Sequence, residues 1–135
     1  MKILPDTNVL IYDTIEDSMH HEDAVKIIDS ASELIIPSIV VYEYIWVMLK
    51  KLNLDINFVR LKVLEYLEDP RTSHVLENMN ILQYALTMLK EDKRNYKYVN
   101  DYVILSVAKY FKAYLATFDK ELKIIAQNKG LKVIP

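Results

Sequence analysis

The sequence contains no cysteine among its 135 residues. This excludes disulfide bonds, zinc sites built on thiolates and cysteine nucleophiles. Glycine is almost as scarce, since Gly130 is the only one. Loops that cradle phosphate groups, such as P-loops and dinucleotide-binding turns, need several glycines so that the backbone can approach the phosphates. If this protein acts on phosphate groups, it must therefore use metal ions or side chains.

Long apolar segments are also missing. No uncharged run approaches the roughly 20 residues that a membrane-spanning helix requires. Asp6 interrupts the N-terminal apolar run, so the basic-then-apolar layout of a signal peptide is missing too. We therefore expect a cytoplasmic protein. With 52% hydrophobic and 27% charged residues, the composition is that of a globular chain, and the length fits one domain over residues 1–135.

Short apolar runs alternate with helical patterns along the chain. Strands are predicted around 3–4 and at 34–36, 73–76, 114–116 and 131–134. Helices are predicted at 7–15, 20–31, 38–51, 56–67, 80–90, 100–111 and 119–128. Ser38 is the predicted N-cap of the third helix. The alternation predicts an α/β fold in which helices cover both faces of a mostly parallel sheet of about five strands.

The opening stretch places an acid directly after a strand. The apolar run that begins at Ile3 halts at Asp6, and a helical pattern starts at once with Thr7. In α/β enzymes a strand that ends in this way places a charge at the carboxyl edge of the sheet, where ligands bind. The alternative is that Asp6 only caps the following helix, because Asp is a preferred N-cap residue.

Four carboxylates stand alone in uncharged surroundings: Asp6, Glu43, Asp101 and Asp119. Glu43 is the most informative, because it lies two turns into an apolar helix and is too far from its start to be a cap. A buried, unpaired carboxylate is costly and is usually paired, protonated or bound to metal. A salt bridge to Glu43 and helix-capping roles for Asp101 and Asp119 remain the alternatives.

Parallel strands would bring these acids together at one edge of the sheet. Asp6 and Asp119 each follow a predicted strand, and Asp101 lies in the first turn of the helix that precedes the second of these strands. Converging carboxylates repel one another unless cations neutralise them. Their hard oxygen ligands suit Mg²⁺ or Mn²⁺ rather than zinc.

Four pieces of the sequence, in this order and spacing, resemble the PIN domain family, in particular its small prokaryotic ribonuclease toxins of VapC type. They are Asp6–Leu10, Glu43 in an early helix, Asn100–Ile104 at the start of a late helix, and Thr117–Asp119 after a strand. The resemblance implies a three-layer α/β/α fold and metal-dependent cleavage of RNA. It also implies a small antitoxin protein as partner, and a homodimer.

The same resemblance assigns roles to residues. It implies that Asp6, Glu43, Asp101 and Asp119 are catalytic residues that ligate Mg²⁺ or Mn²⁺. Asn8 and Thr117 match polar positions that support such a site. The implied chemistry is hydrolysis of a phosphodiester by metal-activated water, which leaves a 5′-phosphate and a 3′-hydroxyl.

Three residues depart from the family pattern. Pro5 stands where an aliphatic residue is usual and removes a backbone donor from the first strand. Tyr102 is bulky where relatives have small residues, so we expect it either to narrow the cleft or to offer a stacking surface. Glu121, two positions after Asp119, leaves open which of these acids would bind a second metal.

A basic and aromatic segment just before Asp101 is the candidate for RNA binding. It contains Lys93, Arg94, Tyr96, Lys97 and Tyr98. Cations for phosphates and aromatic rings for bases are what a single-strand binder uses. The alternative is a solvated loop whose tyrosines pack on the domain.

Two other functions remain open from the sequence. A PIN-like domain can serve as a catalytically silent partner-binding module. A Mg²⁺-dependent phosphatase of the haloacid-dehalogenase type also begins with a strand that ends in Asp. That class needs a second Asp two positions later, where this chain has Asn8, so the phosphatase is disfavoured.

Overall fold

The computed structural model describes all residues from 1 to 135. Its centre is a sheet of five strands in the order β3-β2-β1-β4-β5, in which every neighbouring pair is parallel. The strands are β1 (Lys2–Pro5), β2 (Glu33–Pro37), β3 (Thr72–Val75), β4 (Tyr114–Ala116) and β5 (Val133–Ile134). The predicted α/β class and the five-stranded parallel sheet are confirmed.

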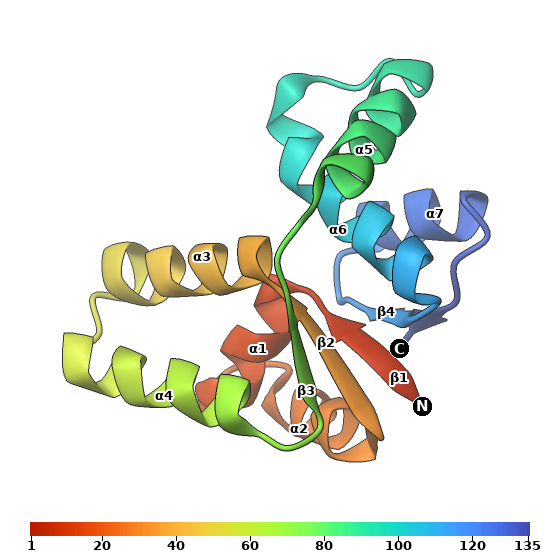
Figure 1. Cartoon of the computed structure of the whole chain (residues 1–135). Coiled ribbons are helices and arrows are strands. Elements are labelled where there is room, and N and C mark those ends of the chain that lie inside the picture. The colour runs from red at the N-terminus through yellow and green to blue at the C-terminus, as the bar shows by residue number, and fades with distance from the viewer.

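Helices connect all the strands. They are α1 (Thr7–Thr14), α2 (His21–Ser30), α3 (Ser38–Trp46), α4 (Ile56–Glu68), α5 (Met79–Glu91), α6 (Val99–Phe111) and α7 (Lys120–Asn128). The π-helical turn η1 (Val47–Lys51) extends α3, and the 3₁₀ turn η2 (Tyr96–Tyr98) precedes α6. Figure 1 shows α3 and α4 on one side of the sheet and α6 and α7 on the other. No helix is long and apolar enough to cross a membrane.

The direction in which strands are added reverses between β1 and β4. The chain first builds β1, β2 and β3 side by side, then returns past β1 to add β4 and β5. Such a reversal opens a crevice at the carboxyl ends of the two central strands, because the connections leave them toward opposite faces of the sheet. The segments that follow β1 and β4 therefore meet at this crevice.

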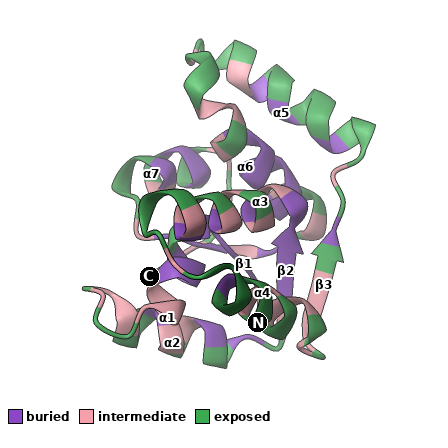
Figure 2. Ribbon diagram, turned by 90° about the vertical axis from the view of Figure 1, so that its left-hand side faces the viewer, coloured by how far each residue is buried: buried purple, intermediate pink, exposed green.

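The core is built on the central strands. Ile3, Leu34, Ile35 and Leu115 are completely buried, and Figure 2 shows that burial concentrates in β2 and α6. Strands of a parallel sheet are apolar on both faces because helices cover both. This explains why the strands read as continuous apolar runs rather than as an alternating pattern.

Pro5 lies just beyond the point where the pairing of β1 with β2 ends. The Asp6 N–H donates to Ala116 O in β4 at 2.9 Å, and donors alternate between neighbours along a strand. An N–H at position 5 would therefore point toward β2. The pairing of β1 with β2 ends at Ile3 and Leu34, so β1 has no ladder hydrogen bond to β2 at the proline.

The prediction that Ser38 caps α3 is wrong. Pro37 occupies the N-cap position, and Ser38 is the first helical residue. The cap comes instead from Glu77, in the segment between β3 and α5. Its carboxylate accepts hydrogen bonds from the Ser38 hydroxyl and from the Ile39 N–H, the latter at 3.0 Å. A carboxylate at this position also stabilises the positive end of the helix dipole.

Replacing Glu77 by alanine should destabilise the protein. The substitution leaves the Ile39 N–H and the Ser38 hydroxyl without their acceptor, and loss of such a cap costs about 1–2 kcal/mol. We expect the melting temperature to fall by about 3–8 °C. Glu91→Ala, at an exposed position near the end of α5, is the matched control and should melt like the wild type. Equal melting of the two variants would contradict the capping role.

Candidate metal centre

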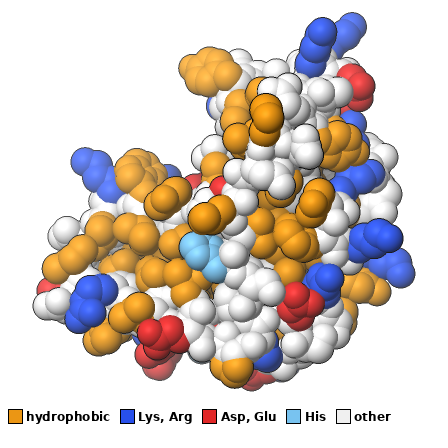
Figure 3. Space-filling view, in the orientation of Figure 1, with side chains coloured by type: hydrophobic (Ala, Val, Ile, Leu, Met, Phe, Trp, Pro, Cys, Tyr) orange, Lys and Arg blue, Asp and Glu red, His pale blue; other side chains and the backbone are white.

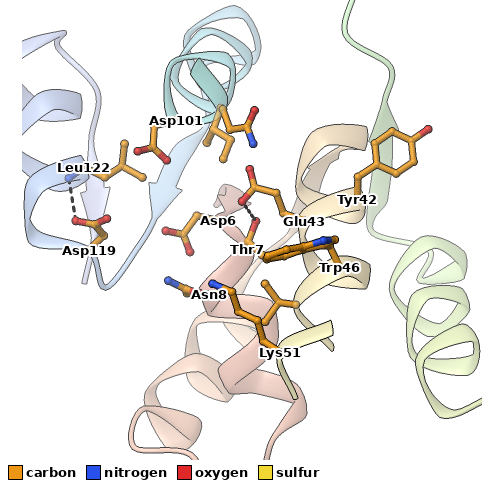
Figure 4. A pocket seen from close by; sticks show the side chains of 13 residues that line it. Asp6, Thr7, Asn8, Tyr42, Glu43, Trp46, Lys51, Asp101, Asp119 and Leu122 are labelled. Carbon is orange, nitrogen blue, oxygen red and sulfur yellow. Dashed lines mark hydrogen bonds between the residues drawn. The ribbon is translucent and has the colours of Figure 1, made fainter. Parts of the chain in front are cut away.

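The crevice at the carboxyl ends of β1 and β4 contains a pocket of about 570 Å³. The four isolated carboxylates all line it: Asp6, Glu43, Asp101 and Asp119. They come from the start of α1, from α3, from α6 and from the start of α7 (Figure 4). Residues up to 113 positions apart in the sequence thus share one acidic cavity, as the predicted parallel sheet required.

Asp6 is both a helix cap and a pocket residue. It is only 5% exposed, and its Oδ1 accepts a hydrogen bond from the Val9 N–H at 3.1 Å, which caps α1. Its Oδ2 accepts from the Thr117 hydroxyl. Burial raises the pKa of Asp6 to about 6, although these hydrogen bonds oppose the increase. The two alternatives considered for this residue are therefore compatible.

Glu43 has one oxygen held and one oxygen without a partner. Its Oε2 accepts from the Thr7 hydroxyl at 3.1 Å, which links α3 to α1. Its Oε1 is buried and no protein group donates to it, although Asn100 lies near enough to lower the pKa. Burial outweighs both neighbours and raises the pKa of Glu43. No lysine or arginine pairs with Glu43, so the structure does not contain the salt bridge considered as an alternative.

Asp101 lies in the first turn of α6, half-buried at the pocket wall. Its pKa rises to about 6, first because of burial and then because of the neighbouring carboxylates, of which Asp119 contributes the most. No hydrogen bond offsets this increase, in contrast to Asp6. It is not the N-cap of its helix, because Tyr98 occupies that position.

Asp119 is the N-cap of α7. Its Oδ1 accepts from the Glu121 N–H at 2.9 Å and from the Leu122 N–H at 3.2 Å. Its Oδ2 accepts no hydrogen bond from the protein, and the residue lines the pocket. Thr117 joins this acid to Asp6, because its buried hydroxyl accepts from the Asp119 N–H at 3.0 Å while donating to Asp6.

The other predicted residues differ in their relation to the pocket. Asn8 lines it from α1. Glu121 does not line it and forms an ion pair with Arg94, with 2.7 Å between Nη1 and Oε1. Tyr102 is fully buried and its hydroxyl donates to Asp92, so the expectation that it narrows the cleft or offers a stacking surface is wrong.

The segment predicted to bind RNA lies outside the pocket. None of Lys93, Arg94, Tyr96, Lys97 and Tyr98 lines it. Arg94 and Lys97 place their charged groups 5.0 and 5.3 Å from the centre of the Tyr98 ring, while Tyr96 is exposed. A role for this segment in RNA binding stays a prediction.

Several pocket residues were not predicted. Thr7, Tyr42, Trp46, Lys51 and Asn100 all line the cavity. The signal for the aromatic pair was present, because positions 42, 43 and 46 share one face of a helix and position 43 was already singled out. The apolar surroundings made these rings look like core residues.

The four carboxylates are ligands of the type that a divalent cation prefers, but their oxygens are not close enough together to coordinate a single ion. No group of three acidic or histidine side chains is close enough together to ligate one ion in this structure. Like charges repel, and hydrogen bonds hold Asp6 and Asp119 in their capping positions. The donor atoms are nevertheless all carboxylate oxygens, and Glu43 Oε1 is buried without a donor. Hard cations such as Mg²⁺ prefer this kind of ligand.

The comparison with protein families identifies the fold. Residues 3–128 match the PIN domain. The chain belongs to the PIN domain family. The matched range contains all four carboxylates of the pocket.

Solved structures share this PIN fold at low sequence identity. VapC20 of Mycobacterium tuberculosis has 15% identity and a TM-score of 0.74, over 90% of this chain and 93% of that one. VapBC2 of Rickettsia felis has 20% identity and a TM-score of 0.71, over 99% and 98% of the chains. FitAcB of Neisseria gonorrhoeae has 22% identity and a TM-score of 0.65, over 98% and 96%. No curated protein matches this PIN domain.

Proposed function

We propose that this PIN domain is a metal-dependent endoribonuclease and the toxin of a toxin–antitoxin pair. The observation that carries the proposal is the pocket itself, in which four carboxylates face one cavity and one buried carboxylate oxygen has no donor. A stable fold does not need such an arrangement, because unpaired buried charge is destabilising. Cation binding removes this cost. The raised pKa values of Asp6 and Asp101 have the same origin.

RNA is the proposed substrate. VapC20 of Mycobacterium tuberculosis, which has the same fold, is described as a toxin that cleaves the sarcin–ricin loop. We propose that Asp6, Glu43, Asp101 and Asp119 hold Mg²⁺ or Mn²⁺. When bound, the cation activates water as nucleophile and neutralises charge on the phosphate.

The remaining residues position these acids. The Thr117 hydroxyl fixes Asp6 and, through the Asp119 N–H, the start of α7. The Thr7 hydroxyl fixes one oxygen of Glu43, which leaves the other buried without a donor. Because Thr7 begins α1 just after β1 and Thr117 directly follows β4, both hydroxyls hold the acids in place before substrate binds. Asn8, at the pocket edge, offers an amide for the same purpose.

A protein partner is the second part of the proposal. The related structures from Rickettsia felis and Klebsiella pneumoniae are described as VapBC2 and as a toxin–antitoxin complex. In this chain, Ile56, Phe58, Leu61 and Leu64 leave apolar surface exposed along α4. Figure 3 shows hydrophobic side chains gathered on the part of the surface that α3 and α4 form. We propose that an antitoxin and a second copy of the chain cover such apolar surface.

Cleavage of RNA should depend on the divalent cation. We expect the purified protein to cleave RNA in Mg²⁺ or Mn²⁺. In excess EDTA the cleavage rate should fall at least about a thousandfold, because a bound cation contributes several kcal/mol of transition-state stabilisation. Mapping of the product ends should show 5′-phosphates and 3′-hydroxyls.

Three other outcomes would each contradict the proposal. Full cleavage in EDTA would exclude the metal. Turnover of a small phosphomonoester but not of RNA would indicate a phosphatase. Binding of Mn²⁺ without any hydrolysis would indicate a partner-binding module.

A further inference from the structure

An exposed tryptophan stands at the edge of the acidic pocket. Trp46, the only tryptophan of the chain, lines the cavity and is 54% exposed. It lies one turn after Glu43 on the same face of α3. In Figure 4 the ring extends toward Glu43 and Thr7, whereas Tyr42 points away from the acids. The protein core does not account for this placement, because the core is on the opposite face of the helix, where Val40 and Tyr44 are buried.

The π-helical turn η1 brings a cation to this ring. In η1 the Leu52 N–H donates to Val47 O at 2.9 Å, so the hydrogen bond spans five residues instead of four. Because this turn is wider than that of an α-helix, residues five positions apart lie close to the same face of the helix. The Lys51 amine consequently lies 5.2 Å from the centre of the Trp46 ring. A regular α-helix would carry Lys51 further around the helix, away from the pocket.

A polyanion meets an electrostatic obstacle at this site. Lys51 is the only basic residue among those that line the cavity, against four carboxylates. A bound cation offsets part of the repulsion at the scissile phosphate, but the flanking nucleotides need another source of affinity. Stacking on an aromatic ring provides it without charge and for any base.

We propose that Trp46 stacks against an unpaired nucleobase next to the scissile phosphate, and that Lys51 leaves the ring to contact the adjoining phosphate. This inference rests on the proposed cleavage of RNA. A nucleobase should bind the Trp46 ring more strongly than the Lys51 amine does. An exposed cation–π contact favours its equilibrium by about two- to fivefold, whereas stacking of one base favours binding by about five- to hundredfold. A base therefore displaces the amine, whose long side chain reaches the backbone instead.

The fluorescence of Trp46 tests the stacking directly, since no other tryptophan contributes. Asp101→Asn protein in Mg²⁺ is titrated with a short single-stranded oligoribonucleotide, with excitation at a wavelength that tyrosine does not absorb. We expect saturable quenching. An abasic oligomer of the same length, with the same phosphates, should leave the emission unchanged. A gel run after the titration verifies that the RNA is intact.

Kinetics of Trp46 variants separate stacking on RNA from packing within the protein. Trp46→Ala and Trp46→Leu should each raise KM for single-stranded RNA about tenfold with little change in kcat, and Trp46→Phe should recover most of the loss. Tyr110→Ala, which removes another exposed ring outside the pocket, should leave KM unchanged. Lys51→Met should weaken RNA binding. It should also reduce the slope of the logarithm of the binding constant against the logarithm of the salt concentration by about one, which corresponds to the loss of one phosphate contact.

The outcomes distinguish this inference from the proposed function. If wild-type protein cleaves the oligomer in Mg²⁺ but RNA does not change Trp46 emission, the stacking inference is wrong and the nuclease stands. Equal KM for Trp46→Ala and wild type also overturns the stacking inference. If wild-type protein cleaves no RNA, the proposed function fails regardless of the fluorescence.

Discussion

Replacing Asp101 by asparagine should abolish RNA cleavage and at the same time stabilise the metal-free protein. Asparagine keeps the size of the side chain and removes its charge. The wild-type carboxylate is half-buried beside three other acids, and burial followed by their repulsion raises its pKa to about 6. Removing this charge should therefore relieve the cost of its burial and the repulsion from the other acids in the folded state. The same substitution removes a proposed metal ligand. Functional sites often trade stability for activity in this way.

The magnitudes can be bounded. Loss of one ligand should reduce cleavage at least about a thousandfold, which is about 4 kcal/mol of transition-state stabilisation. A pKa increase of about two units corresponds to at most about 3 kcal/mol of stability, and solvent screening reduces this to about 1–2 kcal/mol. We expect a melting temperature about 3–8 °C above that of the wild type, measured in EDTA.

Asp17→Asn is the matched control for this experiment. The substitution makes the same chemical change at an exposed position of the loop between α1 and α2, away from the pocket. Its activity and melting temperature should equal those of the wild type. An active Asp101→Asn protein would exclude Asp101 as an essential ligand. An inactive but less stable one would indicate that the carboxylate has a structural role instead.

The metal-free protein should also become more stable as the pH falls from about 7.5 to about 5. Asp6 and Asp101 have pKa values of about 6 in the folded state, against 3.8 as the ordinary value. Between these values the folded state binds more protons than the unfolded state, so the free energy of unfolding decreases as pH rises. The stabilisation is complete below pH 3.8 and is lost as the pH rises through about 6.

Each of these two carboxylates should contribute about 1 kcal/mol over this pH range, so the melting temperature should rise by several degrees. Saturating Mg²⁺ should remove the effect, because the cation stabilises the charged carboxylates and competes with protons. Thermal melts between pH 5 and 7.5, with EDTA or with Mg²⁺, measure both.

A double variant provides the control for the pH effect. Asp6→Asn/Asp101→Asn retains capping ability at position 6, because asparagine is as good an N-cap as aspartate. It should lose most of the pH dependence that metal-free wild-type protein shows over this range. If the double variant and the wild type respond equally to pH, other groups are responsible and the pocket carboxylates are ordinary acids.

The sequence determined most of the fold because its strands are short, continuous apolar runs. Leu34–Ile36 and Tyr114–Ala116 are apolar runs that only a sheet covered on both faces can bury, and the structure contains strands at both positions. Short-range rules were less reliable where a distant residue intervened. Ser38 has the chemistry of an N-cap, but its hydroxyl donates to Glu77, 39 positions later. Tyr102 follows a pocket residue, yet helical geometry directs it into the core toward Asp92.

The sequence by itself also singled out the four carboxylates, because each is a lone charge in an uncharged run. A charge that is buried without a partner is destabilising, so its presence points to a function. Only the tertiary structure decided that they share one cavity, since that depends on the reversal of strand order between β1 and β4. The structure likewise showed that the pairing of β1 with β2 ends before Pro5 and that Trp46 and Lys51 meet at the pocket edge. Strand register fixes the first of these relations and depends on contacts between segments that are far apart in the chain, whereas the wider turn of η1 fixes the second.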